Sequence, residues 1–549
     1  MMESPAEKIK KESNGLRGTL KESLLDEHTG QIREADQLLI KFHGMYMQDD
    51  RDKREERAEK KLDRLYSYMI RLRLPGGFLT AAQWIALHEV TAQHTSGVIK
   101  ITTRQTVQLH GILKHDVKPV IKAFDTQKLD SIAACGDVNR NVAVSAHPRF
   151  SEIHEEIFLY AGKISEHLLP KTNAYYEIWL DKEKISPDTE KDDLYQDRYL
   201  PRKFKIAIAI PPYNDVDVFT NDIGIIAIIE NNKLIGFNVA AGGGLGTTHG
   251  NPETYPRTAT MLGFVTNENL LTVVYEIATT QRDFGNRSDR KFARLKYTID
   301  KMGVDVFRKE VEQRSRIKFA EPKAYTFTVR HDEFGWHQNH EGLFYYTAFA
   351  EAGRLYDDEE VQFKDAFYKI ARTGKANFRF TCNQNIIISD IQPQHKNQIE
   401  EILQQHGIIQ FTDKASVIRK NSIACVAFNT CPLALAEAQR YLPSLITKIE
   451  KLLDAHHLTN ENISIRMTGC PNGCGRPYIS EIGFVGTAYG RYNMYLGADT
   501  PGTRLNKIYK ENIDEAEILA SLDILFKDFA SNRNAGEAFG DYTVRNKIV

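Results

Sequence analysis

The sequence predicts an α+β fold that is built twice around an approximate internal two-fold axis. The first observation is a repeat with a period near 280 residues, which is too long for a solenoid and indicates duplication of a whole lobe. The second is that each half alternates strand and helix patterns before a further α/β segment. The third is the length of 549 residues, enough for about three or four domains.

Four pairs of segments carry the repeat, in the same order in both halves. Residues 77–80 match 353–356, 98–105 match 378–385, 139–142 match 420–423, and 203–212 match 463–471. Two lobes related in this way enclose one central cleft. We expect a large cofactor to lie there, in contact with loops from both halves.

Composition limits the class of partner and the location. Lys plus Arg (72) almost cancel Asp plus Glu (73), which argues against nucleic acid or an acidic membrane as the main partner. Residues 49–61 form a mixed-sign run that predicts a solvated helix or arm. No apolar run approaches the roughly 20 residues of a membrane span, and the first residues lack a secretory signal, so we expect a cytoplasmic protein.

Four of the six cysteines lie close together near the C-terminus. They are Cys425, Cys431, Cys470 and Cys474. Two pairs of thiolates suit zinc or an iron-sulfur cluster; the five-residue gap in the first pair weakens zinc without excluding it. The second pair lies in a glycine-rich turn that leaves room for a bulky neighbour and points backbone N–H groups inward. We expect a helix after Cys431, ending at Pro443, and read Cys135 and Cys382 as buried hydrophobes.

Two strand patterns place basic residues on one face. Around residue 71, alternation puts Arg71 and Arg73 on one face and apolar residues on the other. In the same way, Lys203 and Lys205 alternate with a buried face in residues 203–210. Taken singly, each basic pair fits a solvated strand face better than a binding site.

Residues 424–437 (ACVAFNTCPLALAE) and 467–477 (MTGCPNGCGRP) together resemble the cluster motif of the siroheme-dependent sulfite and nitrite reductases, and the resemblance extends from about residue 12 to the C-terminus. It implies that the four cysteines hold a 4Fe-4S cluster and that Cys474 also bridges it to the siroheme iron. It implies further that Arg71, Arg140, Lys203 and Lys205 surround the anionic substrate. The loop 104–111, with Arg104, Gln108 and His110, and a second basic cluster containing Arg294 would contact siroheme. That cluster comprises Gln281, Arg282, Arg287, Arg290, Arg294 and Lys296.

The family's architecture gives the expected domains. They are an N-terminal arm over 1–66 that could contact a partner, paired ferredoxin-like repeats over 67–132 and 326–412, a siroheme and substrate lobe over 133–325, and a cluster and siroheme lobe over 413–549. The fold class is therefore α+β, with internally duplicated ferredoxin-like repeats and two α/β cofactor-binding lobes.

The resemblance also implies the reaction, a six-electron reduction of sulfite to sulfide in assimilatory sulfate reduction and cysteine biosynthesis. The glycine run 241–250 lacks both the phosphate-loop ending and the dinucleotide pattern, so the chain needs an electron-supplying partner. The C-terminal segments 490–499, 509–513 and 539–545 look closer to the group supplied by an NADPH-oxidising flavoprotein subunit. A ferredoxin-dependent sulfite or nitrite reductase stays open, as does, more remotely, a non-catalytic zinc-bearing scaffold.

Overall fold

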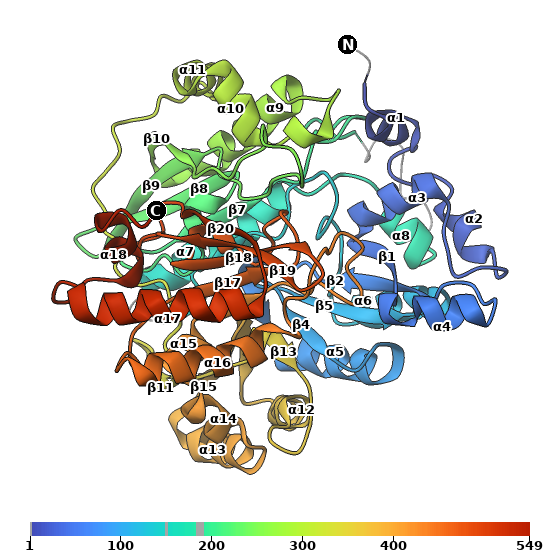
Figure 1. The fold of residues 1–549 in the computed structure, drawn as a ribbon. Coiled ribbons are helices and arrows are strands. Elements are labelled where there is room, and N and C mark those ends of the chain that lie inside the picture. The colour runs from blue at the N-terminus through green and yellow to red at the C-terminus, as the bar shows by residue number, and fades with distance from the viewer. Residues whose placement is uncertain (1–2, 149–151, 183–190) are drawn as a thin grey trace.

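The computed structural model describes residues 3–148, 152–182 and 191–549 (Figure 1). The described chain forms four five-stranded sheets. The first is ordered β1 (Met45–Asp49), β2 (Tyr66–Arg71), β5 (Val107–Ile112), β4 (Ile99–Ile101), β13 (Arg354–Leu355). The second is ordered β11 (Gly335–Gln338), β12 (Phe344–Ala348), β15 (Ile386–Ile391), β14 (Asn377–Phe380), β3 (Phe78–Leu79).

These two sheets exchange their edge strands, which explains one pair of repeated segments. Strand β13 from the second half pairs with β4, and β3 from the first half pairs with β14. Each exchanged strand follows a glycine with positive φ, Gly77 at 75° and Gly353 at 69°. A Cβ atom would lie 2.9 Å from the Phe380 carbonyl oxygen at the first position and 2.6 Å from that of Ile101 at the second. Both positions therefore require glycine.

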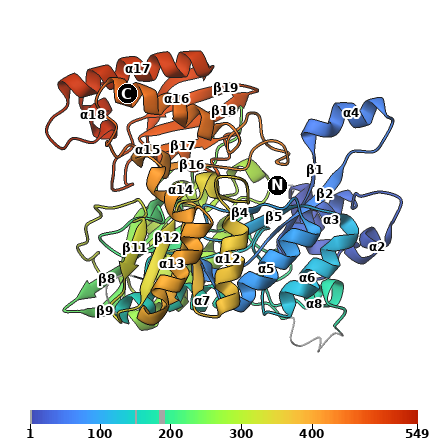
Figure 2. The same ribbon diagram turned by 90° about the horizontal axis from the view of Figure 1, so that it is seen from below.

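Helices cover these sheets along one side. They are α5 (Ala81–His94) and α6 (Val117–Asp125) from the first half, and α12 (Phe363–Thr373) and α13 (Lys396–Gln405) from the second (Figure 2). Helix α5 begins with a capping box in which Thr80 accepts the Gln83 N–H. Trp84 of α5 packs against Phe367 of α12, so the core runs across the boundary between the halves.

The other two sheets form two lobes of identical topology. The first lobe is ordered β6 (Ala143–Val144), β7 (Ile206–Ala209), β8 (Ile223–Glu230), β9 (Lys233–Ala241), β10 (Thr260–Val265). The second lobe is ordered β16 (Ser422–Ala424), β17 (Ile465–Thr468), β18 (Ile482–Ala488), β19 (Arg491–Leu496), β20 (Lys507–Ile513). In each lobe the first three strands are parallel and the last two antiparallel. The predicted duplicated α+β fold is confirmed.

Helices pack on both lobes. Those of the first are α7 (Glu152–His167), α8 (Ala174–Trp179), α9 (Leu270–Phe284), α10 (Leu295–Met302) and α11 (Val304–Ser315). Those of the second are α15 (Val417–Lys420), α16 (Leu442–Ala455), α17 (Glu515–Asn532) and α18 (Phe539–Arg545), and α14 (Ile408–Lys414) precedes them. Every residue of β7 is buried, in agreement with a parallel strand covered on both faces.

Two details differ from the sequence predictions. The first is the alignment of residues 139–142 with 420–423. Ser145 N–H donates to the Ile208 oxygen at 3.2 Å, and Cys425 N–H donates to the Met467 oxygen at 3.2 Å, so Ser145 and Cys425 are equivalent. The predicted alignment is therefore shifted by one residue, and Arg140 corresponds to Lys420. Residues 432–441 form turns instead of the predicted helix. Pro443 lies in the first turn of α16, where its missing N–H costs nothing.

The N-terminal segment contains α1 (Pro5–Glu12), α2 (Leu20–Leu25), α3 (Glu34–Leu39) and α4 (Arg54–Glu59). Helix α4 has no buried residue, which confirms a solvated helix in the mixed-sign run. Helix α1 instead buries Lys10, whose ammonium contacts Glu7 at 2.5 Å and Asp137 at 3.8 Å. None of the helices in the described residues combines the length and apolar character of a membrane crossing.

Candidate active site and cofactor cleft

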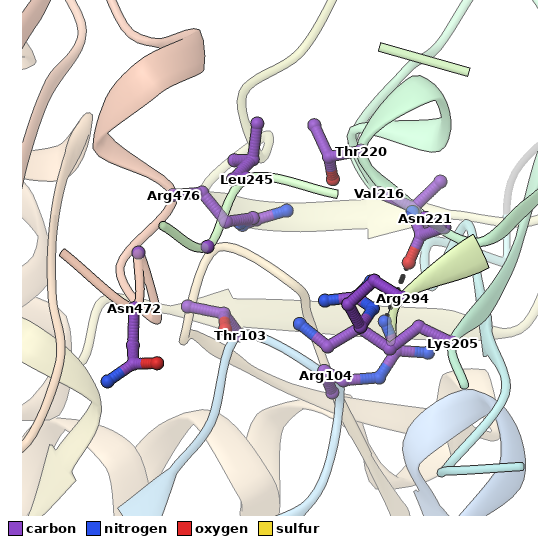
Figure 3. A pocket seen from close by; sticks show the side chains of 12 residues that line it. Thr103, Arg104, Lys205, Val216, Thr220, Asn221, Leu245, Arg294, Asn472 and Arg476 are labelled. Atoms are coloured by element: carbon purple, nitrogen blue, oxygen red, sulfur yellow. Dashed lines mark hydrogen bonds between the residues drawn. The ribbon is translucent and has the colours of Figure 1, made fainter. Parts of the chain in front are cut away.

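A cleft of about 400 Å³ lies between the halves, as predicted (Figure 3). Three separate parts of the chain line it: the turn after β4, the first lobe, and the loop after β17. Its polar lining includes Thr103, Arg104, Lys205, Asn221, Arg294, Asn472 and Arg476. The loops meet directly, because Thr103 donates to the Cys474 carbonyl oxygen at 3.0 Å and Thr247 N–H to that of Pro471 at 2.9 Å.

The four clustered cysteines converge at one edge of the second lobe. Strands β16 and β17 are parallel neighbours, so the loops that follow them start at the same edge of the sheet. The Cys425 sulfur accepts the Gly469 N–H at 3.3 Å and the Thr468 hydroxyl at 3.4 Å, the inward-pointing donors that the glycine-rich turn predicted. Cys470 is buried, whereas Cys474 is exposed and so open to a further ligand partner.

The spacing of these sulfurs suits a cluster better than a single ion. A tetrahedral zinc site with bonds of about 2.3 Å holds its sulfurs about 3.8 Å apart. Within the described residues, no three of the cysteine sulfurs lie within 4.8 Å of one another. Burial and the neighbouring thiols raise the pKa of Cys425 and Cys431 to about 12, so the thiolates require a bound cation.

Lys203 and Lys205 lie just before β7, and Lys205 lines the cleft. The backbone N–H of Lys205 donates to Asp222 at 2.9 Å, which fixes the strand entry. Among the described residues neither ammonium group has a hydrogen-bond acceptor or an ion-pair partner. Burial, followed by the charge of Arg202, lowers the pKa of Lys203 to about 7. Burial and the Lys203 charge hold the pKa of Lys205 well below its usual value.

Arg71 and Arg140 are held by one turn, residues 134–136. Arg140 donates to the Gly136 oxygen at 2.8 Å and to the Ala134 oxygen at 3.2 Å. Arg71 donates through Nη1 to the Cys135 sulfur at 3.0 Å. Cys135 is fully buried, as predicted, but it also orients a guanidinium, a contact that sequence reasoning missed.

Gln108 and His110 extend this arrangement toward the cluster loop. Gln108 accepts from Arg71 Nη2 at 2.8 Å, and its amide nitrogen lies 3.1 Å from His110 Nε2. His110 Nδ1 lies 2.9 Å from Gln48 Oε1 and 3.3 Å from the Thr430 hydroxyl. Burial lowers the pKa of His110 to about 3, so the ring is neutral and links Arg71 to the loop between Cys425 and Cys431.

Of the predicted siroheme contacts, Arg104 and Arg294 line the cleft. Arg104 donates to Asn221 at 2.7 Å and to the Ile206 oxygen at 2.8 Å, which leaves its buried Nε without a partner. Arg294 makes a buried ion pair with Asp222 at 2.7 Å. Other members of the second basic cluster are tied to the protein: Arg282 pairs with Asp283, Arg287 with Glu7, and Arg290 with Asp137.

A buried charge cluster between the lobes was not predicted. Asp217 accepts Arg466 at 2.5 Å, Arg330 at 2.7 Å and Arg476 at 2.7 Å. Asp217 and Arg476 occupy equivalent left-handed positions in the two lobes, before matching 3₁₀ turns η6 (Val218–Thr220) and η11 (Pro477–Ile479). Three guanidiniums exceed one carboxylate, so this cluster adds positive charge beside the cleft.

The residues present fit a polyanionic macrocycle next to a cluster. Arg71, Arg104 and Arg476 each keep a buried Nε that has no hydrogen-bond acceptor among the described residues, and a spare buried donor of this kind suits an anionic ligand. Gly246 lets the loops of the two halves approach closely at the cleft, because a Cβ atom there would lie 3.0 Å from the Asn472 oxygen.

Comparisons with known proteins agree with this geometry. A family model described as the nitrite and sulphite reductase 4Fe-4S domain matches residues 160–319, and one described as the nitrite/sulfite reductase ferredoxin-like half domain matches residues 60–126 and 337–406. The solved structure of the Mycobacterium tuberculosis NirA protein superposes with a TM-score of 0.80 at 24% identity, over 99% of this chain and 97% of that one. That likeness supports the fold.

Curated relatives extend over the full chain. The sulfite reductase [NADPH] hemoprotein beta-component of Leptospira biflexa serovar Patoc is 62% identical over 548 residues, covering 100% of this chain and 99% of its own length. The protein of the same name from Staphylococcus haemolyticus is 51% identical over 544 residues, covering 99% and 95%. The chain therefore belongs to the siroheme-dependent nitrite and sulfite reductase family, whose cofactors are siroheme and a 4Fe-4S cluster.

Proposed function

We propose that this chain reduces sulfite to hydrogen sulfide with six electrons delivered by an NADPH-oxidising flavoprotein subunit, in assimilatory sulfate reduction and cysteine biosynthesis. The observation that carries the proposal is the pair of ammonium groups of Lys203 and Lys205, which have no acceptor among the described residues. Lys205 lines the cleft, and both lysines lie close enough to Cys474 for its charge to act on their pKa values. An anionic substrate supplies the missing charge. The names of the relatives support the same reaction.

The four cysteines would hold the 4Fe-4S cluster, and Cys474 would also hold siroheme. Its exposure, and the hydrogen bond from Thr103 of the cleft to its carbonyl oxygen, support this role. When bound, the cofactor pair supplies single electrons to the substrate at iron. Arg104 and Arg294 would contact the carboxylates of siroheme, and Gln108 and His110 would lie at its edge while they position Arg71.

Arg71, Arg140, Lys203 and Lys205 would bind and orient the anion. Guanidinium forks held by residues 134–136 present fixed N–H donors to oxyanion oxygens. With a pKa of about 7, Lys203 Nζ can hold a proton near neutral pH and release it when oxygen leaves as water. Lys205 lies within the electrostatic reach of Lys203, Arg294 and Arg104, and together these groups give the site a positive potential for an anion.

We also propose a division of the chain by task. The arm over 1–66 closes the first lobe, and 67–132 with 326–412 form the scaffold of exchanged sheets. Residues 133–325 supply the substrate cations, and 413–549 supply the cluster ligands. A flavoprotein subunit would deliver electrons to the cluster. We place the enzyme in the cytoplasm, where thiols serve as metal ligands rather than disulfides.

The test is the visible spectrum and metal content of the chain expressed with siroheme synthesis. Siroheme bands, about five irons per chain, and sulfide formation from sulfite with a chemical reductant are expected. Sulfite and nitrite turnover are then compared with the flavoprotein plus NADPH and with reduced ferredoxin. Faster nitrite turnover, or activity with ferredoxin alone, would replace the proposal by the alternative within the family. A colourless protein that contains zinc would support the remaining alternative, a non-catalytic zinc-bearing scaffold.

A further inference from the structure

A second pocket of about 490 Å³ lies at the edge of the second lobe, beyond the Asp217 charge cluster. It is defined here by Arg330, Asp332, Lys420, Asn462, Arg466 and Glu481, all of which line it. By sheet register, Lys420 corresponds to Arg140, Asn462 to Lys203 and Glu481 to Asp222. The second pocket is thus the counterpart of the cationic cleft in the other half.

The carboxylates of this pocket are already saturated by the protein. Asp332 accepts from Thr381 at 2.6 Å, Asn385 at 2.8 Å and Asn383 at 3.2 Å, and it lies 3.2 Å from His147. Glu481 accepts from the Ser464 N–H at 2.8 Å and the Gly540 N–H at 3.1 Å. Their lone pairs are therefore used inside the protein and are not offered to a ligand.

The donors of the pocket are not saturated. Arg466 is 3% exposed and donates through Nη1 to Asp217, but within the described residues its Nε and Nη2 have no acceptor. The Lys420 ammonium has no acceptor there either and lies 5.3 Å from the centre of the Phe334 ring. Asn462 accepts from Asn421 through Oδ1, which leaves its amide N–H groups available.

We propose that the second pocket binds a small inorganic oxyanion of the sulfate, sulfite or phosphate type. Two free N–H groups of one guanidinium match two oxygens of such an anion, and the lysine and asparagine reach the others. The pocket does not suit a cation, because its carboxylates already accept hydrogen bonds from the protein. It does not suit an apolar ligand either, because the Arg466 donors would stay without an acceptor. Because the pocket joins Arg330 and Asp332 to the second lobe, the bound anion stabilises the contact between the halves.

The test uses the holoenzyme and selenate, a tetrahedral oxyanion that is visible by anomalous scattering. Crystals soaked in selenate are expected to show one site at Lys203 and Lys205 and another between Lys420 and Arg466. A map without density at Arg466, or with density there that persists unchanged in Lys420→Met, would overturn the proposal and leave an adventitious ion only.

Affinity gives a second readout. Inorganic phosphate is titrated against holoenzyme of the Lys203→Met variant, which lacks a cation of the cleft, and the thermal midpoint is followed. We expect the midpoint to rise with phosphate and the apparent Kd to weaken by about tenfold or more when Lys420→Met is added. An equal response with and without Lys420 would overturn the proposal. Sulfite turnover is measured in parallel, so failure of the reductase assignment is detected separately.

Discussion

At equivalent positions of the same backbone frame, the two lobes carry different reactive groups. Cys425 and Cys474 of the second lobe correspond to Ser145 and Asp215 of the first, where the serine hydroxyl donates to the carboxylate at 2.6 Å. The first lobe thus has a hydrogen bond at the positions where the second lobe has two of the proposed cluster ligands. The sheet register fixes where the loops start, and the loop side chains decide the chemistry.

The basic side chains are distributed in the opposite way to the cysteines: the lysines of the site lie in the first lobe. Lys205 N–H donates to Asp222 at 2.9 Å and Ser464 N–H to Glu481 at 2.8 Å, so the strand entries coincide. The first lobe nevertheless has lysine at the position where the second has serine. One lobe supplies positive charge and the other supplies sulfur, and the loops of both meet at the cleft. The duplicated frame therefore gives one composite site in place of two equal ones.

The largest effect is expected from Cys474→Ser. Loss of the thiolate that we propose as a ligand shared by both cofactors should reduce sulfite turnover below about 1% of wild type and disturb the siroheme and cluster absorption together. The visible spectrum and iron content are the measurements. A variant that keeps both spectra would contradict the bridge. Val216→Ala, in the first-lobe loop at the cleft, serves as a control for packing and should keep both cofactors.

Lys203→Met and Lys205→Met should each reduce sulfite turnover about 100-fold with both cofactors retained, because an anion-stabilising charge is lost. The matched changes in the second lobe, Asn462→Leu and Ser464→Ala, should leave turnover within about twofold. Steady-state kinetics with a chemical reductant separate the two pairs. Equal losses in both lobes would mean that the asymmetry of charge is structural rather than catalytic.

The pH dependence sharpens the same contrast. Since the pKa of Lys203 is about 7 in the protein alone, the ammonium loses its charge as the pH rises through this value. The kcat/KM for sulfite should then fall by up to tenfold per pH unit on the alkaline side, from a midpoint raised by bound anions. Lys203→Met should lack this limb of the profile. An unchanged limb in that variant would assign it to another group.

Cys135→Ala removes one acceptor that holds Arg71 and should raise the KM for sulfite about three- to tenfold, with a smaller change in kcat. Cys382→Ala is the matched control, since Cys382 is also buried but has no contact with Arg71. Full cofactor content in both variants is the condition for the comparison. Equal KM values would remove the positioning role of the Cys135 thiol.

The smallest effect is expected from Lys420→Met. Lys420 corresponds to Arg140 by register but faces the second pocket, so sulfite turnover should stay within about twofold of wild type. Arg140→Met, by contrast, should raise the KM for sulfite at least about tenfold. Initial-rate measurements at several sulfite concentrations test both. A large loss in Lys420→Met would show that the pockets are coupled in catalysis.

The sequence by itself determined the duplication, the cysteine constellation and the alternation that sets Lys203 and Lys205 apart from the apolar side chains, because each shows as a recurring residue type or motif. It did not give the exchange of β3 and β13, since two-residue strands carry no periodicity. Nor did it give the contact between Arg71 and Cys135, or the neutral state of His110.

Only the tertiary structure decided how Asp217 gathers three arginines. Arg466 lies 249 residues away in the sequence and Arg330 lies 113, so no spacing rule connects them. The same holds for the second pocket, where the sequence does not show that side chains of the turn after β14 saturate Asp332. Buried polar groups need hydrogen-bond partners. Which residues become those partners depends on the fold, because the fold brings distant loops to one sheet edge.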